Sequence, residues 1–347
     1  MPTTRAYAAP TAGAPLVPTE VPRREVGEHD VLIDIAYCGV CHSDVHQARD
    51  EWGGGIFPMV PGHEIVGRVA RVGAKVTRFG TGDLAGVGCM VDSCRGCGSC
   101  RRDLEQFCER GAAMTYNGTE MDRRTPTYGG YSKQVVVDER FTLRLSPDLD
   151  LAGTAPLLCA GITTYSPLRH WRAGKGTRVG VVGLGGLGHM AVKLAASMEA
   201  EVTMLSTSRA KEPDARRLGA HHFALTSDPA TFTRLAGHFD LLLDTVSAPH
   251  DLDRHLGMLR VDGAMVLLGV PPTPAPVHAF SLIGGRRTLS GSLIGGIAET
   301  QEMLDHCAAA RITSDVEVIP IQQINEAYER MIRADVRYRF VIDLSSL

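Results

Sequence analysis

The sequence predicts a two-domain α/β protein, in which a doubly wound parallel sheet accompanies a β-rich domain that carries a four-cysteine lobe. The length of 347 residues suits two domains of roughly 150 residues each. Short strands with Gly and Pro turns dominate residues 26–145, and strands alternate with helices after about residue 150. Four closely spaced cysteines near residue 100 indicate the lobe.

Composition narrows the function classes. The net charge of −3 and the pI of about 6.5 give no positive field for a polyanion, so nucleic-acid binding is not expected. No apolar run reaches the roughly 18 residues that a membrane span needs, and the first twenty residues lack a signal-peptide pattern. We therefore expect a cytoplasmic protein whose nine cysteines are mostly reduced and favour metal binding over disulfides.

The elements follow in order along the chain. Alternating apolar residues predict strands at 30–38 and 64–73, and two more within 131–146. Residues 176–206 are typical of strand, glycine turn, helix and strand, and buried strands follow at 239–246 and 263–270. We expect a helix over 251–260, and a C-terminal succession of helix, strand, helix and strand after residue 298.

The lobe sequence "CRGCGSCRRDLEQFC" predicts a structural zinc site. Four thiolates can complete a tetrahedron around zinc with no open position, and the short spacings match such sites. Free or disulfide-linked cysteines, an iron–sulfur cluster and a nucleic-acid-binding zinc ribbon are the alternatives. The arginines nearby are too few for the ribbon, and no second cysteine group supports a ferredoxin-like cluster. The expected ligands are Cys94, Cys97, Cys100 and Cys108.

Three further residues form a second candidate metal set. Cys41, His63 and Cys159 supply two thiolates and one imidazole, which leaves a fourth zinc position open as in catalytic sites. Taken singly, each also fits an ordinary buried side chain, so the assignment depends on the motifs around them.

Those motifs resemble a known family. The stretch "GHEIVGRVARVGAKV" (62–76) matches the zinc-containing alcohol dehydrogenase signature, and the four-cysteine lobe follows where that family has it. The chain is similar to medium-chain, zinc-dependent alcohol dehydrogenases from about residue 5 to 345. Four further motifs place it nearest the cinnamyl alcohol dehydrogenase branch: "CGVCHSDVH" (38–46), "TPTYGGYS" (125–132), "CAGITTYSPL" (159–168) and "VRYRFVIDL" (336–344).

The resemblance implies a domain organisation. Residues 1–157 and 296–347 would form a GroES-like catalytic zinc domain, and 158–295 a Rossmann domain that binds NADP. The family also implies a homodimer that contains two zinc ions per chain, one catalytic and one structural.

The resemblance further implies roles at the catalytic zinc. Cys41, His63 and Cys159 would hold the ion, and Glu64 would serve as an alternate ligand when substrate leaves. Asp44 resembles the carboxylate that hydrogen-bonds the zinc histidine, as ligating imidazoles require; a solvated turn aspartate is the alternative.

Two further residues suit a proton relay. A hydroxyl both donates and accepts, so Ser43 can pass a proton from a buried oxygen, and the imidazole of His46 can take up and release a proton and finish the relay. An ordinary surface histidine is the alternative for His46.

A glycine-rich turn predicts a dinucleotide site. Gly183, Gly185 and Gly188, with Gly186 and Leu187 between them, form G-x-G-x-x-G directly after a strand and before a helix. Such glycines let the backbone and the helix N-terminus approach a pyrophosphate. A merely flexible loop is the alternative.

The second strand of that unit favours NADP(H). An NAD enzyme would place an acid there, whereas "LSTSRAK" (205–211) has none. Its hydroxyls and cations can bind a 2′-phosphate, although the cations could also be plain surface charges. The residues are Ser206, Thr207, Ser208, Arg209 and Lys211.

The remaining site residues come from the resemblance. Thr163, Val246, Val270 and Ser292 would approach the nicotinamide, and Arg339 the pyrophosphate. The substrate pocket would contain Trp52, Cys89, Met114, Ile283, Leu293 and Ile294. Its mostly apolar character suits aromatic or medium aliphatic aldehydes, although Met114 departs from the large aromatic typical of plant enzymes.

We therefore expect an NADP-dependent zinc alcohol dehydrogenase that interconverts a small-molecule primary alcohol and its aldehyde. A polyol or secondary-alcohol dehydrogenase, and a non-catalytic protein that binds NADPH and zinc, are the alternatives.

Overall fold

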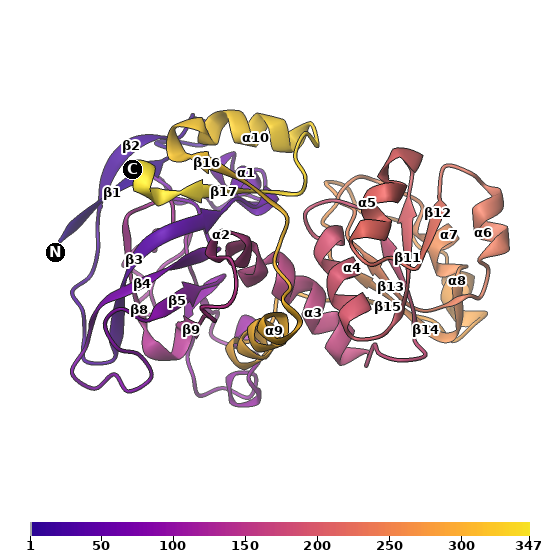
Figure 1. The fold of residues 1–347 in the computed structure, drawn as a ribbon, viewed down its shortest axis with the longest axis horizontal. Coiled ribbons are helices and arrows are strands. Elements are labelled where there is room, and N and C mark those ends of the chain that lie inside the picture. The colour runs from indigo at the N-terminus through magenta and orange to yellow at the C-terminus, as the bar shows by residue number, and fades with distance from the viewer. Residues whose placement is uncertain (1) are drawn as a thin grey trace. The chain divides into compact units, whose positions relative to one another are not determined.

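A computed structural model describes residues 2–347, which divide into two compact units (Figure 1). The first unit combines Met1–Cys159 with Gly295–Leu347, and the second unit is Ala160–Ile294. The chain therefore leaves the first unit once and returns to it. No helix in the described range is long and apolar enough to cross a membrane.

The first unit contains a seven-stranded sheet in the order β16-β17-β3-β4-β5-β9, in which β8 also pairs with β3. Because β17 comes from the end of the chain and pairs with β3, the C-terminal segment is part of this sheet. Two-stranded sheets join β1 to β2 and β6 to β7. The strands are β1 (Thr3–Ala8), β2 (Val17–Pro22), β3 (Asp30–Gly39), β4 (Ile65–Val72), β5 (Leu84–Val87), β6 (Met90–Asp92), β7 (Ala113–Met114), β8 (Gln134–Asp138), β9 (Leu143–Arg144), β16 (Val316–Pro320) and β17 (Arg339–Asp343).

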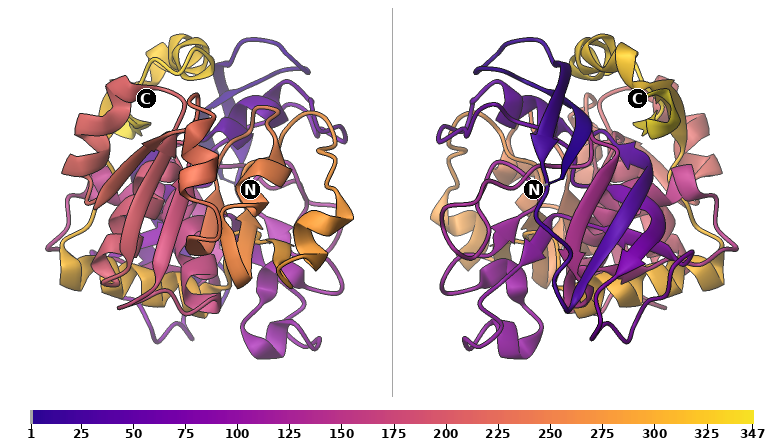
Figure 2. Two further views of the ribbon diagram at one scale, coloured as in Figure 1. Left: turned by 90° about the vertical axis from the view of Figure 1, so that its right-hand side faces the viewer. Right: turned by 90° about the vertical axis from the view of Figure 1, so that its left-hand side faces the viewer.

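The strands predicted at 30–38, 64–73 and 131–146 are confirmed as β3, β4 and the pair β8 and β9. The described part of the first unit also has four α-helices, two of them from the C-terminal segment. In the right view of Figure 2 the strands of this unit face the viewer. The helices are α1 (His42–Ala48), α2 (Leu151–Thr154), α9 (Ile297–Ala310) and α10 (Ile324–Ile332).

The second unit has a six-stranded sheet in the order β12-β11-β10-β13-β14-β15, and every pair in it is parallel. Numbered from its first strand, this order is 3-2-1-4-5-6, the arrangement of a Rossmann fold. The left view of Figure 2 shows the strands as neighbouring arrows with helices beside them. The elements are α3 (Ala160–His170), β10 (Arg178–Val182), α4 (Gly188–Ser197), β11 (Glu201–Ser206), α5 (Glu212–Arg217), β12 (His222–Leu225), α6 (Ala230–Arg234), β13 (Phe239–Asp244), α7 (Leu252–Leu256), β14 (Leu259–Leu267), α8 (Ala279–Ile283) and β15 (Thr288–Gly291).

One predicted helix is shorter in the structure. The helix expected over 251–260 ends at Leu256, and strand β14 already begins at Leu259. Gly257 follows the helix, and Leu259 pairs with Phe239 of β13, so sheet pairing outweighs helix propensity there. Leu259 and Phe239 are both fully buried in the core cluster of this unit.

Candidate functional site

Four side chains able to bind a metal meet in the first unit. Cys41 directly precedes helix α1, His63 and Glu64 directly precede strand β4, and Cys159 follows a short 3-10 turn after α2. All four are buried, and their ligand atoms lie within 4.8 Å of one another. The structure thus brings together the three predicted zinc ligands and the predicted alternate ligand.

The spacing of the two sulfurs suits zinc. Cys41 Sγ lies 3.9 Å from Cys159 Sγ, and two Zn–S bonds of about 2.3 Å in a tetrahedron would place the sulfurs about 3.8 Å apart. The hydrogen bond with Cys159 lowers the pKa of the Cys41 thiol well below its usual value, and the charge of Arg339 acts in the same direction. Two thiols, an imidazole and a carboxylate are donor types that zinc takes in proteins, so this set fits the ion.

Asp44 fixes the orientation of the zinc histidine. Its fully buried carboxylate lies 3.1 Å from His63 Nδ1, and it accepts hydrogen bonds from the Cys41 amide at 2.9 Å and the Gly62 amide at 3.2 Å. Tyr131, also fully buried, donates its hydroxyl to the same carboxylate at 3.1 Å. Since Nδ1 of His63 faces Asp44, Nε2 is the nitrogen left for a metal ion.

Glu64 forms a buried ion pair with Arg339 of β17, and its Oε1 accepts from the guanidinium. Burial raises the pKa of Glu64 to about 7, although the charge of Arg339 opposes that shift. Its other oxygen, Oε2, is buried without a hydrogen-bond partner in the described part of the chain. The Oε2 atom of Glu64 is therefore available to a metal ion. The predicted contact between Arg339 and the pyrophosphate of the coenzyme stays a prediction.

The two predicted relay residues lie three positions apart on helix α1, a spacing that places them on one face. Ser43 Oγ is 3.6 Å from Cys41 Sγ, beside the metal-binding group. His46 is partly exposed, with Nδ1 2.5 Å from Glu51 Oε2 and its ring stacked on Trp52 at a centroid distance of 5.0 Å. Ser43 is therefore beside the metal-binding group, and His46 lies one helical turn further along the same face.

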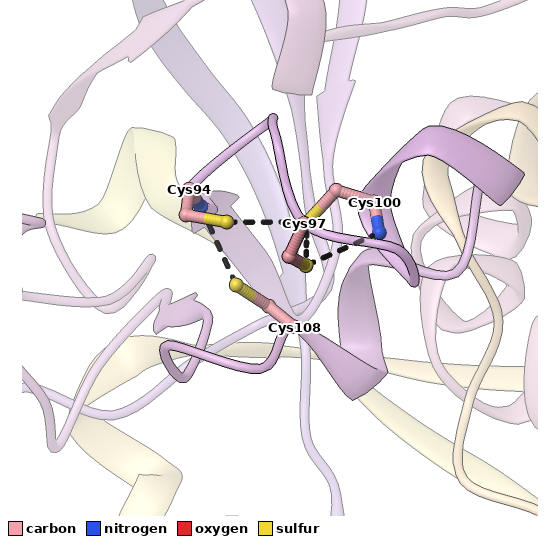
Figure 3. A group of neighbouring side chains, drawn as sticks. All are labelled: Cys94, Cys97, Cys100 and Cys108. Atoms are coloured by element: carbon pink, nitrogen blue, oxygen red, sulfur yellow. Dashed lines mark hydrogen bonds between the residues drawn. The ribbon is translucent and has the colours of Figure 1, made fainter.

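The four cysteines of the lobe form a second group, with all four sulfurs within 4.8 Å of one another (Figure 3). Cys94 Sγ is 3.9 Å and Cys97 Sγ is 3.4 Å from Cys100 Sγ. Amide hydrogen bonds from Cys100 and Glu109 lower the pKa of Cys97 to about 6. No other group of three or more potential ligands is found in residues 2–347, so the two predicted zinc sites account for both clusters.

The glycine-rich turn lies between β10 and α4 of the second unit. Gly183 has φ +90°, a value that favours glycine, and a Cβ there would come 2.7 Å from a Val246 methyl. A Cβ on Gly188 would lie 1.9 Å from the Gly183 carbonyl oxygen, so no side chain fits at the start of α4. At Gly185 a Cβ would meet nothing within 4 Å, which leaves an open approach to the backbone for a pyrophosphate.

The segment predicted to bind a 2′-phosphate follows strand β11. Lys211 Nζ donates to the carbonyl of Leu184 at 2.9 Å, which ties this segment to the glycine turn. Arg209 is largely exposed and lies 3.4 Å from Glu212 Oε2. The Ser206 hydroxyl accepts from the Ser208 amide at 3.2 Å. The glycine turn and the segment 205–211 therefore lie together at the carboxyl-terminal ends of the neighbouring strands β10 and β11.

Comparisons with known proteins agree with this geometry. Residues 27–147 match the alcohol dehydrogenase GroES-like domain, and residues 186–309 match the zinc-binding dehydrogenase model. The chain is 57% identical to NADP-dependent alcohol dehydrogenase C 1 of Mycolicibacterium smegmatis, over 100% of this chain and 99% of that protein. The chain belongs to the zinc-binding alcohol dehydrogenase family. It is thus an oxidoreductase, and the resemblance seen in the sequence is confirmed.

Two further members of the alcohol dehydrogenase family support this placement. The aldehyde reductase YahK of Escherichia coli is 54% identical over 99% of both chains. The structure of a cinnamyl alcohol dehydrogenase from Sorghum bicolor superposes with a TM-score of 0.96 at 42% identity, over 99% of this chain and 98% of that one. The GroES-like and Rossmann architecture, and the cinnamyl alcohol dehydrogenase-like branch, are therefore established.

The other residues predicted for this alcohol dehydrogenase are divided between the units. Val246, Val270 and Ser292 come shortly after strands β13, β14 and β15, at the carboxyl ends where nucleotides bind in such sheets. Thr163 is buried on α3. Of the predicted pocket residues, the first unit contains Trp52, Cys89 and Met114, and the second contains Ile283, Leu293 and Ile294.

The sequence did not indicate three contacts around the zinc ligands. Tyr131 donates to Asp44, Glu51 faces His46, and the Tyr116 ring stacks on His63 at a centroid distance of 5.7 Å. Tyr131 lies in "TPTYGGYS", which served only as a family motif, and no spacing rule links any of these residues to its partner.

Proposed function

We propose that this alcohol dehydrogenase interconverts primary alcohols and aldehydes with aromatic or medium aliphatic bodies, and that its coenzyme is NADP(H). The observation that supports this most strongly is the buried set of Cys41, His63 and Cys159 with an unpartnered Glu64 oxygen beside it. Three protein ligands and a fourth position open to water or substrate are what a catalytic zinc needs. When bound, zinc polarises the substrate oxygen, and the nicotinamide accepts or donates a hydride.

The residues around the ligands have separate tasks in this proposal. Asp44 holds His63 in the tautomer that offers Nε2, and the amide and tyrosine donors hold Asp44 in turn. Ser43, beside the ligand Cys41, takes the proton of the substrate oxygen. His46, on the same face of helix α1 and next to Glu51, passes the proton to water. Glu64 would offer a ligand oxygen to a bound zinc when substrate leaves, because Arg339 anchors one carboxylate oxygen and leaves the other free.

The choice of NADP(H) follows from charge. Residues 205–211 offer Arg209, Lys211 and two serine hydroxyls and contain no carboxylate, which suits a 2′-phosphate. The Mycolicibacterium smegmatis relative is named as NADP-dependent, in agreement with this choice.

The homodimer and the cytoplasmic location that the sequence predicts are also part of the proposal. Phe280 of the second unit is a large apolar residue that is 70% exposed and has no other predicted role, as a homodimer interface would require. Cys38, Cys41, Cys89, Cys94, Cys97, Cys100, Cys108 and Cys159 are free thiols in the structure, which suits the reducing cytoplasm.

A substrate panel tests the proposal. Zinc-loaded protein is assayed with NADPH against benzaldehyde, cinnamaldehyde and hexanal, and with NADP+ against mannitol and 2-butanol. We expect the aldehydes to give the highest kcat/KM, and we expect Cys159→Ser to abolish turnover while the matched control Cys307→Ser, a buried cysteine outside both metal groups, retains it. Faster turnover of mannitol would contradict the substrate class, and no turnover by protein with two bound zinc ions would refute the enzymatic role.

A further inference from the structure

A third thiol lies beside the ligands of the candidate catalytic zinc. Cys89 belongs to the short connection between strands β5 and β6, and it is half-buried, whereas Cys41 and Cys159 are 8% and 7% exposed. It is outside the set of four ligand atoms that lie within 4.8 Å of one another. This region therefore contains one thiol more than the zinc site uses, and that thiol is the most exposed of the three.

The Cys89 thiol contacts the thiol of the zinc ligand Cys159. The two side chains share a hydrogen bond. Cys89 Sγ also donates to the carbonyl of Leu158, the chain neighbour of Cys159, at 3.8 Å. The backbones approach closely as well, because a Cβ on Gly88 would lie 3.1 Å from the Leu158 carbonyl oxygen. The two segments that contain these thiols are therefore packed directly against each other.

This contact suits a disulfide between Cys89 and Cys159. A disulfide has an S–S bond of about 2.05 Å and Cβ atoms about 3.5–4.5 Å apart. Because the two thiols are already hydrogen-bonded, rotation of their side chains would bring the sulfurs toward that distance. The backbone of Cys89 is held in place meanwhile, since its carbonyl accepts from the amide of the buried Thr115 at 3.0 Å.

A bond between Cys89 and Cys159 would remove one of the three predicted zinc ligands. The thiolate is the form of cysteine that binds a metal ion, and a sulfur in a disulfide no longer has that charge. Cys41 and His63 would then be the remaining firm ligands, with Glu64 beside them. A zinc site with two firm ligands lacks the three that a catalytic zinc takes, so the ion would be released.

We propose that Cys89 is an oxidation site through which hydrogen peroxide ends zinc binding. The Cys89 thiolate attacks a peroxide oxygen, the O–O bond breaks, and the leaving hydroxide takes up the proton that the thiol lost, which gives a sulfenic acid and water. The Cys159 thiolate then attacks the Cys89 sulfur, the S–O bond breaks, and the leaving hydroxide becomes a second water by taking up a proton. The two sulfurs supply the two electrons that reduce the peroxide.

Cys41 is the competing partner for Cys159, because their sulfurs are 3.9 Å apart. Both of these cysteines are buried and both are predicted ligands, so a bound zinc ion would hold their two sulfurs. Cys89 is more exposed and is outside the ligand set, and exposure favours oxidation of a cysteine. Peroxide should therefore react first at Cys89, and the expected product is the Cys89–Cys159 disulfide.

The test treats the zinc-loaded protein with hydrogen peroxide, follows zinc release with a chromophoric chelator, and maps disulfides by mass spectrometry after free thiols are blocked. We expect a peptide pair linked through Cys89 and Cys159 to accumulate as zinc is released, and dithiothreitol with added zinc to reverse both changes. Zinc release should be about tenfold slower in Cys89→Ser and in Cys89→Ala. Cys307→Ser, a fully buried cysteine beside Met303, is the matched control and should release zinc as wild type does.

The proposal is overturned if no disulfide forms at Cys89, if the main product joins Cys41 to Cys159, or if both Cys89 variants release zinc as fast as wild type. Zinc lost from the four-cysteine lobe is common to all these proteins, so the difference between them reports the catalytic site. The inference rests on the proposed function only for Cys159 as a zinc ligand. Since the assay contains no alcohol, aldehyde or coenzyme, its failure leaves the proposed substrate class intact. Thermal unfolding and zinc content before oxidation verify that each variant is folded.

Discussion

Tyr131→Phe tests whether the hydroxyl of Tyr131 supports the zinc histidine. The change removes only the oxygen that donates to Asp44 at 3.1 Å, and the ring keeps its place in the core. Asp44 retains its contacts with Cys41, Gly62 and His63. A hydrogen bond to a charged group contributes about 1.5–3 kcal/mol, and loss of a group that orients a metal ligand lowers metal affinity about 10–100-fold.

The assay measures zinc affinity at each site by competition with a chromophoric chelator. We expect the weaker-bound, catalytic zinc to lose about 10–100-fold in affinity in Tyr131→Phe, while the four-cysteine site is unchanged. Tyr37→Phe, a half-buried tyrosine on β3, is the matched control. An affinity within threefold of wild type at the catalytic site, in a variant of unchanged stability, would refute the argument that Tyr131 holds Asp44.

Three other predictions concern the lobe, the glycine turn and a histidine of the second unit. Cys97→Ser should lower the zinc content from two ions per chain to one and lower the Tm, as measured by metal analysis and calorimetry. Gly188→Ala should weaken NADPH binding at least tenfold in a fluorescence titration, because a Cβ would lie 1.9 Å from the Gly183 carbonyl oxygen; unchanged affinity would contradict this. The interaction with Asp244, 3.0 Å away, raises the pKa of His250 above its usual value of about 6.5. The pair therefore stabilises the fold fully below about pH 6, and this contribution is lost as pH rises through the raised pKa. The difference in unfolding free energy between wild type and His250→Gln should accordingly shrink from pH 6 to 8, and a constant difference would contradict the pairing.

The sequence was most informative where a rule of spacing or period applies. The lobe cysteines are close in the chain, and short loops alone bring them together, so Cys94 to Cys108 could be predicted as one cluster. The parallel, doubly wound sheet could be predicted from alternating strands and helices and a glycine turn at Gly183, whereas its strand order comes from the structure.

The catalytic set could be predicted only through the family resemblance. Cys41 and Cys159 are 118 positions apart, and only the packing of the first unit brings their sulfurs to 3.9 Å. The same holds for Tyr131 and Asp44, because tertiary contacts of single side chains leave no periodic signal in the sequence. The predicted helix over 251–260 was too long for a related reason, since a strand pairing with Phe239 decided the conformation of Leu259.

The measurement that tests the central claim most directly is the coenzyme preference of the zinc-loaded enzyme with benzaldehyde. Steady-state oxidation of NADPH and NADH is followed at 340 nm, with two zinc ions per chain verified beforehand. We predict turnover with both and a kcat/KM at least tenfold higher for NADPH, because residues 205–211 include Arg209 and Lys211 and contain no carboxylate. A preference for NADH, or no oxidation of either coenzyme, would contradict the account.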